Sequence, residues 1–286
     1  MTETLPNAGQ IDYWNGEVGS RWARLQSDLD ALFVNVTTAL VKAADPRAGE
    51  RVLDIGCGCG GSLMALSRWV GPTGRVLGLD ISQPMLDVAR DRIAAGAARN
   101  AAVLLGDAAV HPFEPGSADL VASRFGVMFF DRPAAAFANI RNALKPGGRL
   151  VFVCWRPYKD NPFFAAPHWA AKPHLPPDEA PKPDPDAPGP FALADPDRLR
   201  AILGDAGFRE IVIEPVDVML PLAGAGELDV ATRLISQVGP VARALATADT
   251  AQRETATAAI RETLEDYDGP SGVSVPARIW VVTAAA

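Results

Sequence analysis

The chain has 286 residues, 48% of them hydrophobic, which is enough to bury the core of one large α/β domain with insertions. Its 27 Lys and Arg against 34 Asp and Glu give a net charge of −7, and this acidic balance disfavours nucleic acid as the default partner. The first residues lack the basic and apolar regions of a signal peptide, and no apolar run approaches the roughly 18 residues that span a bilayer.

The N-terminal segment is predicted to be helical. Apolar residues recur every three or four positions and would form one stripe, and Asp45-Pro46 would end the helix. The stripe consists of Val18, Trp22, Leu25, Leu29, Leu32, Val36 and Leu40.

Between residues 51 and 155, short apolar runs alternate with helical patterns. Ser82 can cap the second of these helices, Pro133 suits the first turn of the third, and Pro146-Gly147-Gly148 would stop the third. Buried strands separated by helices indicate a doubly wound parallel sheet. The predicted strands are 51–55, 75–80, 101–107, 119–123 and 149–155, and the predicted helices are 61–70, 83–95 and 133–144.

The second half of the chain is less regular. Frequent prolines over 157–190 predict a loop-rich insertion without regular helix. A helix opened by Asp195-Pro196 and closed by Gly207 follows, then a strand near 210–214, helices over 227–266 broken at Gly239-Pro240, and a last strand at 277–283. With these two strands the prediction is an α/β fold with a seven-stranded, mostly parallel, Rossmann-like sheet. The predicted parts are an N-terminal helical lid (1–45), a core (46–156), a proline-rich lid insertion (157–190), a core helix and strand (191–222), a helical insertion (223–270) and the last core strand (271–286).

A glycine-rich loop after the first predicted strand is the strongest functional indication. Val52–Ile55 runs into Gly56-Cys57-Gly58-Cys59-Gly60-Gly61, where a missing Cβ lets the backbone approach a ligand. Such loops lie at the carboxyl ends of the strands, where sheets of this kind bind ligands. The same glycines satisfy the G-x-G-x-x-G pattern of dinucleotide-binding proteins, and a plain tight turn is a third interpretation.

Two acidic residues end the next two strands. Asp80 lies 20 residues after Gly60 and can accept hydrogen bonds from both ribose hydroxyls, although it also suits a turn or helix cap. Ribose binding would fit NAD as well as S-adenosylmethionine. At Gly106-Asp107-Ala108, a carboxylate lies beside a backbone N–H. The carboxylate can accept from the amino group of adenine and the N–H can donate to one of its ring nitrogens, but the three residues also suit an ordinary turn.

Together with Asp54 and Pro146-Gly147-Gly148, these residues resemble class I S-adenosylmethionine-dependent methyltransferases, specifically the type 11 group that includes ubiquinone and menaquinone C-methyltransferases. The resemblance covers 50–155 well and 191–220 loosely. It implies S-adenosylmethionine as cofactor and S-adenosylhomocysteine as product. The cofactor contacts that it implies are Tyr13, Trp22, Asp54, Gly56, Cys57, Gly58, Gly60, Asp80, Ile81, Met85, Gly106, Asp107, Ala108, Ser123 and Arg124. Trp22 can equally be a core residue.

Methyl transfer from a sulfonium is an in-line displacement that needs alignment and exclusion of water rather than a metal. No catalytic base is assigned; His168 in the proline-rich insertion is the best candidate. We expect an apolar small-molecule acceptor, because aromatic residues crowd the predicted strand ends. The expected acceptor contacts are Phe125, Met128, Phe129, Trp155, Phe163 and Trp169.

Two other functions stay open at this stage. One is an NAD(P)-dependent oxidoreductase, although none of the three tyrosines has a lysine four residues later. The other is a non-catalytic S-adenosylmethionine-binding protein. Three cysteines without a disulfide or zinc pattern predict a cytoplasmic protein without a metal site. The sequence leaves the oligomeric state open, with a homodimer through 227–266 as one alternative.

Overall fold

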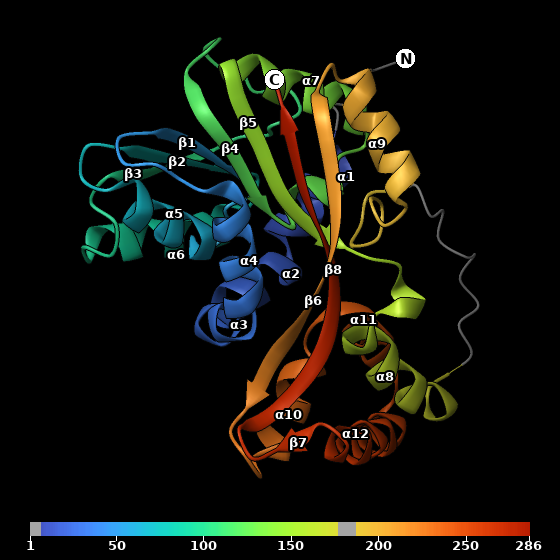
Figure 1. The fold of residues 1–286 in the computed structure, drawn as a ribbon. Coiled ribbons are helices and arrows are strands. Elements are labelled where there is room, and N and C mark those ends of the chain that lie inside the picture. The colour runs from blue at the N-terminus through green and yellow to red at the C-terminus, as the bar shows by residue number, and fades with distance from the viewer. Residues whose placement is uncertain (1–6, 177–186) are drawn as a thin grey trace.

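A central, mostly parallel sheet organises the computed structural model, which describes residues 7–176 and 187–286 (Figure 1). The strand order is β3-β2-β1-β4-β5-β8-β6, and the two-residue β7 pairs with β8 as an eighth strand. The first five strands are parallel, whereas β8 is antiparallel to both β5 and β6. The predicted α/β, Rossmann-like fold is therefore confirmed. The strands are β1 (Arg51–Ile55), β2 (Arg75–Asp80), β3 (Ala101–Leu105), β4 (Ala118–Arg124), β5 (Leu144–Trp155), β6 (Arg209–Ala223), β7 (Asp268–Gly269) and β8 (Gly272–Ala285).

Helices pack on the sheet as expected for a doubly wound fold. Helices α4 and α5 pack against the central strands, while α7 and α9 pack against each other and against β5 and β6. Pro133 opens α7 as predicted, but Ser82 makes no side-chain cap bond for α6. Helix α7 already ends at Ala143, and Pro146-Gly147-Gly148 lies inside β5. The core helices are α5 (Gly61–Val70), α6 (Gln83–Ala94), α7 (Pro133–Ala143) and α9 (Pro196–Asp205).

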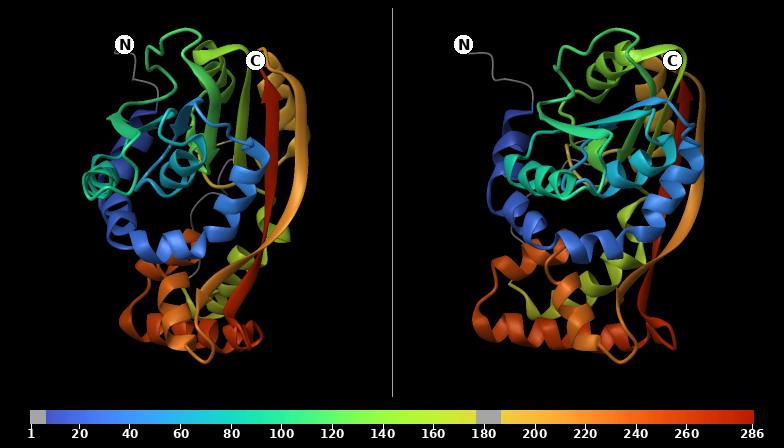
Figure 2. Two further views of the ribbon diagram at one scale, coloured as in Figure 1. Left: turned by 60° about the vertical axis from the view of Figure 1, so that its left-hand side comes forward. Right: turned by 90° about the vertical axis from the view of Figure 1, so that its left-hand side faces the viewer.

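The N-terminal segment forms four short helices instead of one long one. They are α1 (Ala8–Asn15), α2 (Glu17–Arg24), α3 (Gln26–Leu32) and α4 (Val34–Ala44). The apolar stripe holds for Leu29, Leu32, Val36 and Leu40, which are buried, and α4 ends before Asp45 as predicted. Figure 2 shows these helices in blue, running down one side of the sheet core and then between it and a second group of helices below.

That second group of helices is carried by the long strands β6 and β8, which extend past the rest of the sheet (Figure 1). Both strands are longer than predicted. Pro215 and Pro221 do not end β6, because β6 is an edge strand that pairs only with β8 and can lack an N–H donor. The helices of the group are α8 (Pro162–Ala171), α10 (Leu228–Ile235), α11 (Gly239–Ala246) and α12 (Thr250–Glu265).

The prediction of 157–190 as loop without regular helix was wrong for its first part. Pro162 occupies the first turn of α8, where its missing N–H costs nothing, and Pro167 is accepted inside the helix. Asn161 fixes the start of α8, since its side chain donates to the carbonyl of Arg278 at 2.7 Å and accepts from the Arg278 N–H at 3.3 Å. Short 3-10 helices lie at Tyr158–Asp160 and Lys172–His174, as well as at Gly126–Phe129 after β4. Residues 177–186 of the predicted insertion lie outside the described residues.

Within the described residues, no helix is both long and apolar enough to cross a membrane.

Candidate functional site

The glycine loop follows β1 directly, and α5 begins at Gly61, so the predicted strand–loop–helix unit is present. Gly56, Gly58 and Gly60 have φ of 67°, 53° and 86°, a region that glycine adopts without a steric penalty. A Cβ on Gly56 would lie 2.5 Å from the Cα of Gly126, which shows how closely this loop approaches the turn after β4. The loop therefore presents bare backbone at the carboxyl edge of the sheet.

Asp80 at the end of β2 holds this loop in place. One carboxylate oxygen accepts from the N–H of Gly58 at 2.7 Å, and the other accepts from the N–H of Ser82 at 2.8 Å. Burial raises the pKa of Asp80, and these backbone hydrogen bonds oppose the rise. The predicted proximity of Asp80 to the glycine loop is thus observed.

Asp54 lies beneath the loop and is fully buried. Its Oδ2 accepts from the hydroxyl of Ser62 at 2.7 Å, whereas its buried Oδ1 has no hydrogen-bond partner among the described residues. Burial raises the pKa of Asp54 to about 7, against the opposing effects of the Ser62 hydrogen bond and the Arg124 charge. An unpartnered buried carboxylate oxygen is costly, and such groups concentrate at functional sites.

A small cavity of about 60 Å³ opens above the loop. Arg124 and Asp30 bring charge to it, and Trp22 and Phe33 bring aromatic surface. Burial lowers the pKa of Arg124, while the carboxylates of Asp30 and Asp54 favour its charged form. The guanidinium donates to the Thr37 hydroxyl at 2.8 Å and lies 5.5 Å from the centre of the Phe33 ring. The complete lining is Trp22, Gln26, Leu29, Asp30, Phe33, Gly56, Cys57, Gly58, Cys59, Met85, Arg124 and Phe125.

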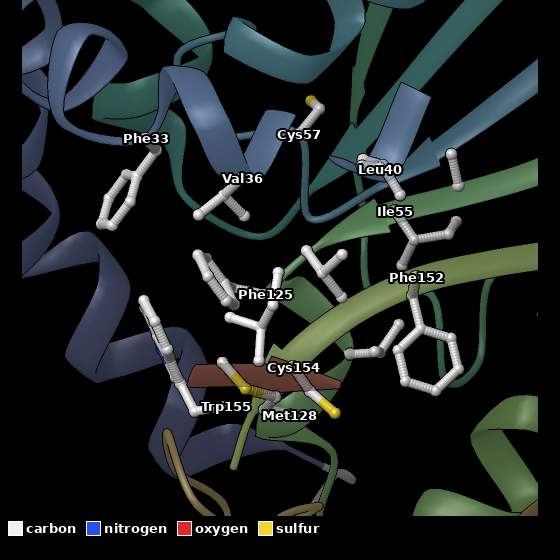
Figure 3. Close-up of a cluster of buried hydrophobic side chains, with 14 of the residues drawn as sticks. Phe33, Val36, Leu40, Ile55, Cys57, Phe125, Met128, Phe152, Cys154 and Trp155 are labelled. Atoms are coloured by element: carbon white, nitrogen blue, oxygen red, sulfur yellow. The ribbon is translucent and has the colours of Figure 1, made fainter. Parts of the chain in front are cut away.

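Aromatic rings continue from the cavity into the protein (Figure 3). Phe125 stacks on Trp155 with ring centres 4.1 Å apart and 15° between planes, and Phe33 contacts both rings. Phe125 has a φ of 70°, which is strained for a residue with a bulky side chain. Such strain is typical of functional sites, and here it places the ring at the cavity wall.

The predicted adenine-reading residue, Asp107, follows β3. Its carboxylate accepts from the N–H of Ala109 at 2.9 Å and from the side-chain amide of Asn7 at 2.9 Å to each oxygen. Ala108 beside it is buried. None of these residues lines the cavity described above.

Several predicted site residues lie elsewhere. Tyr13 and Trp169 are 40% and 58% exposed. The Trp169 ring faces the Lys172 ammonium at 4.8 Å. Met128 and Phe163 are buried in the hydrophobic core, and Ser123 is buried with its hydroxyl donating to the carbonyl of Ile55. The cavity lining does not include Gly60, Ile81, Gly106 or Phe129. The His168 ring lies 5.8 Å from that of Tyr158.

Sequence reasoning missed several residues at this site: Gln26, Leu29, Asp30, Phe33 and Cys59 in the cavity wall, Arg92 behind it, and Asn7 at Asp107. Asp30 Oδ2 accepts from Arg92 at 2.7 Å and from Gln26 at 2.7 Å, and Arg92 also donates to the Cys59 carbonyl. No motif marks Asn7, Asp30, Phe33 or Arg92, because they meet the site from segments distant in sequence: Asn7 at Asp107, and the others near the glycine loop. The acidic and aromatic positions on the N-terminal helical pattern were the available indication.

Comparison with known proteins bears on the segment that contains this site. The family model described as a methyltransferase domain matches residues 52–148, which include the glycine loop, Asp80 and Asp107. Residues 52–148 belong to this domain family. The resemblance to class I S-adenosylmethionine-dependent methyltransferases of the type 11 group, and with it the cofactor class, is therefore confirmed for this segment of the chain.

Two curated relatives extend the methyltransferase comparison. A demethylmenaquinone methyltransferase of Lactococcus lactis is 39% identical over 105 residues, covering 37% of this chain and 42% of the relative. The aklanonic acid methyltransferase DauC of Streptomyces sp. (strain C5) is 35% identical over 149 residues, covering 52% and 63%. The matched parts thus span less than two thirds of either relative.

A solved methyltransferase structure shares the fold. Phosphoethanolamine N-methyltransferase 2 of Haemonchus contortus matches with a TM-score of 0.59 at 19% identity, over 100% of this chain and 61% of that one. At this identity the match concerns the fold alone.

Proposed function

We propose that this methyltransferase-domain chain transfers a methyl group from S-adenosylmethionine to an apolar small molecule. The observation that carries the proposal is the joint placement of the glycine loop, the Asp80 carboxylate that fixes it, and a cavity with enclosed charges of both signs beside aromatic rings. A plain tight turn would not require a partly buried guanidinium at the same place.

The residues present fit the two ends of the cofactor. Its methionine part carries an ammonium and a carboxylate, which match the carboxylate of Asp30 and the guanidinium of Arg124 in the cavity wall. The Oδ1 of Asp54 beneath the loop, which has no partner among the described residues, adds negative potential when Asp54 is ionised. Asp80 would accept hydrogen bonds from the ribose hydroxyls. Asp107 and Ala108 would hydrogen-bond the adenine.

When bound, the cofactor supplies a methyl group on a positively charged sulfur. The chain's own residues have to orient the acceptor, exclude water and favour the positive charge. The faces of Trp22 and Phe33 in the cavity wall suit a cation, since aromatic rings attract positive charge at their faces. We assign no catalytic base, because none of the described titratable groups in the cavity wall is placed as one, and His168 packs against Tyr158.

The acceptor side is proposed to be the aromatic wall of Phe33, Phe125 and Trp155. Stacked, buried rings favour a flat apolar acceptor, and the relatives named for demethylmenaquinone and aklanonic acid are consistent with that class. We place the enzyme in the cytoplasm, since Cys57, Cys59 and Cys154 are all free and buried.

Calorimetry with S-adenosylhomocysteine, followed by transfer of a labelled methyl group into a host metabolite extract, tests the proposal. Asp80→Ala should weaken S-adenosylhomocysteine binding by about 2–4 kcal/mol, because it removes the ribose acceptor and releases the Gly58 N–H. The matched control is Asp87→Ala, an exposed carboxylate on α6 that pairs with Arg90 away from the cavity.

Three results would contradict the proposal or part of it. Binding of NAD but not of S-adenosylhomocysteine would indicate an oxidoreductase. Cofactor binding without incorporation of label would indicate a non-catalytic binding protein. An unchanged affinity in Asp80→Ala would refute the role of Asp80.

A further inference from the structure

Both polar atoms of the Asn7 carboxamide make hydrogen bonds, at the Asp107 end of the site and away from the cavity. Its Nδ2 donates to both oxygens of Asp107 at 2.9 Å, and its Oδ1 accepts from the N–H of Asp131 at 2.7 Å. Its own backbone N–H donates to the Asp131 carboxylate at 2.7 Å. Asn7 is only 2% exposed and adopts φ 57° to fit. This polar side chain is thus held as firmly as that of a core residue.

The atoms that Asn7 presents are those of an adenine edge. A carboxamide offers an N–H₂ donor next to an acceptor oxygen, and adenine offers its N–H₂ donor next to an acceptor ring nitrogen. Asp107 is the residue proposed to accept from the adenine amino group. In this structure the Asn7 amide makes that contact, and its oxygen accepts from a backbone N–H, that of Asp131.

The end of α1 packs over the neighbouring part of the site, next to Asp80. The hydroxyl of Ser82 donates to the Trp14 carbonyl at 2.7 Å. Asn15 donates to the carbonyl of Ile81 at 2.8 Å and accepts from the N–H of Gln83 at 2.9 Å. These contacts cover the segment after β2 that follows Asp80. The remaining cavity of about 60 Å³ lies at the glycine loop, well below the roughly 300 Å³ of a small-molecule pocket.

We propose that Asn7 is an internal competitor of adenine: the segment 7–15 docks on Asp107 and must leave it before the adenosine part of the cofactor binds there. The inference rests on the proposed function. The docked state lowers the apparent cofactor affinity by the fraction of molecules in which Asp107 is occupied. Release of the segment 7–15 and entry of the cofactor are then one coupled event, while Trp22, Asp30 and Phe33 stay in the cavity wall.

The first test is calorimetry of the full chain with S-adenosylhomocysteine. Asn7→Ala removes the carboxamide and should bind at least fivefold more tightly than the wild type. Asn7→Asp should do the same, because it places a carboxylate against Asp107 and Asp131. The control is Asn35→Ala, an exposed asparagine on α4 that donates to the Met219 carbonyl and should leave the affinity unchanged.

The second test follows hydrogen exchange of α1, in which the N–H groups of Gln10 and Ile11 donate to the Asn7 carbonyl. Saturating S-adenosylhomocysteine, or adenosine alone, should accelerate exchange over 8–15, whereas methionine alone should not. Slower exchange with adenosine, or an unchanged or weaker affinity in both variants, overturns the inference while leaving the proposed function intact. No S-adenosylhomocysteine binding in wild type or variants overturns the proposed function and this inference with it.

Discussion

Replacing the buried carboxyl of Asp54 with an amide should change how the stability of the protein depends on pH. Asp54 has a pKa of about 7 in the folded chain and 3.8 as its ordinary value. Between these values the folded chain binds a proton that the unfolded chain has lost, so the free energy of unfolding falls as pH rises. The stability that the protonated Asp54 carboxyl contributes is lost progressively from about pH 4 to pH 7. Above pH 7, Asp54 no longer makes the free energy of unfolding depend on pH.

The size of the effect follows from that gap of about three pH units. At 1.36 kcal/mol per unit the whole cost of ionising Asp54 is roughly 4 kcal/mol, of which about 2–3 kcal/mol falls between pH 5 and pH 8. In Asp54→Asn this dependence is absent. The variant should therefore gain about 2–3 kcal/mol over the wild type on going from pH 5 to pH 8, whatever its constant offset from altered packing around Ser62.

Urea unfolding of both proteins at pH 5, 6, 7 and 8 measures this difference. Asp119→Asn is the matched control: although burial works to raise it, the Lys145 ammonium holds the pKa of Asp119 below its usual range. The contribution of Asp119 is therefore lost only as pH falls below about 4, and its difference from wild type should stay flat between pH 5 and 8. A flat difference for Asp54→Asn as well would refute the desolvation argument.

Three further changes test the site. Gly58→Ala should cost about 1–2 kcal/mol of stability, because φ is 53° and the new Cβ would lie 2.6 Å from the Met85 methyl. The same variant should weaken S-adenosylhomocysteine binding at least tenfold. Its control is Gly147→Ala, with φ 78° and open space around it, which should share the stability loss but keep the affinity. Arg124→Met should weaken S-adenosylhomocysteine binding about tenfold in calorimetry while adenosine binding stays unchanged, and equal losses for both ligands would argue against a contact at the methionine end. Burial raises the pKa of Cys59 to about 12. Iodoacetamide at pH 8 should therefore alkylate Cys59 about 100-fold more slowly in the folded than in the urea-unfolded chain. Equal alkylation rates, measured by mass spectrometry, would contradict the burial of Cys59.

The amino-acid sequence determined the local frame of the site. The limits of β1, β2 and α5 agree with the predicted ranges, because glycines, caps and short apolar runs act within a few residues. The proximity of Asp80 to the glycine loop also followed from sequence, since the carboxyl ends of parallel strands share one edge.

Only the tertiary structure decided which distant groups meet at that edge. Asn7 binds Asp107 across 100 residues, and Arg92 reaches Asp30 across 62. Proline also has a different effect at the edge strand β6 and in the first turn of α8 than in the middle of a sheet or helix. Local patterns fix where a strand or helix forms, but the partner of a buried polar group is chosen by whatever the completed fold places within hydrogen-bond distance.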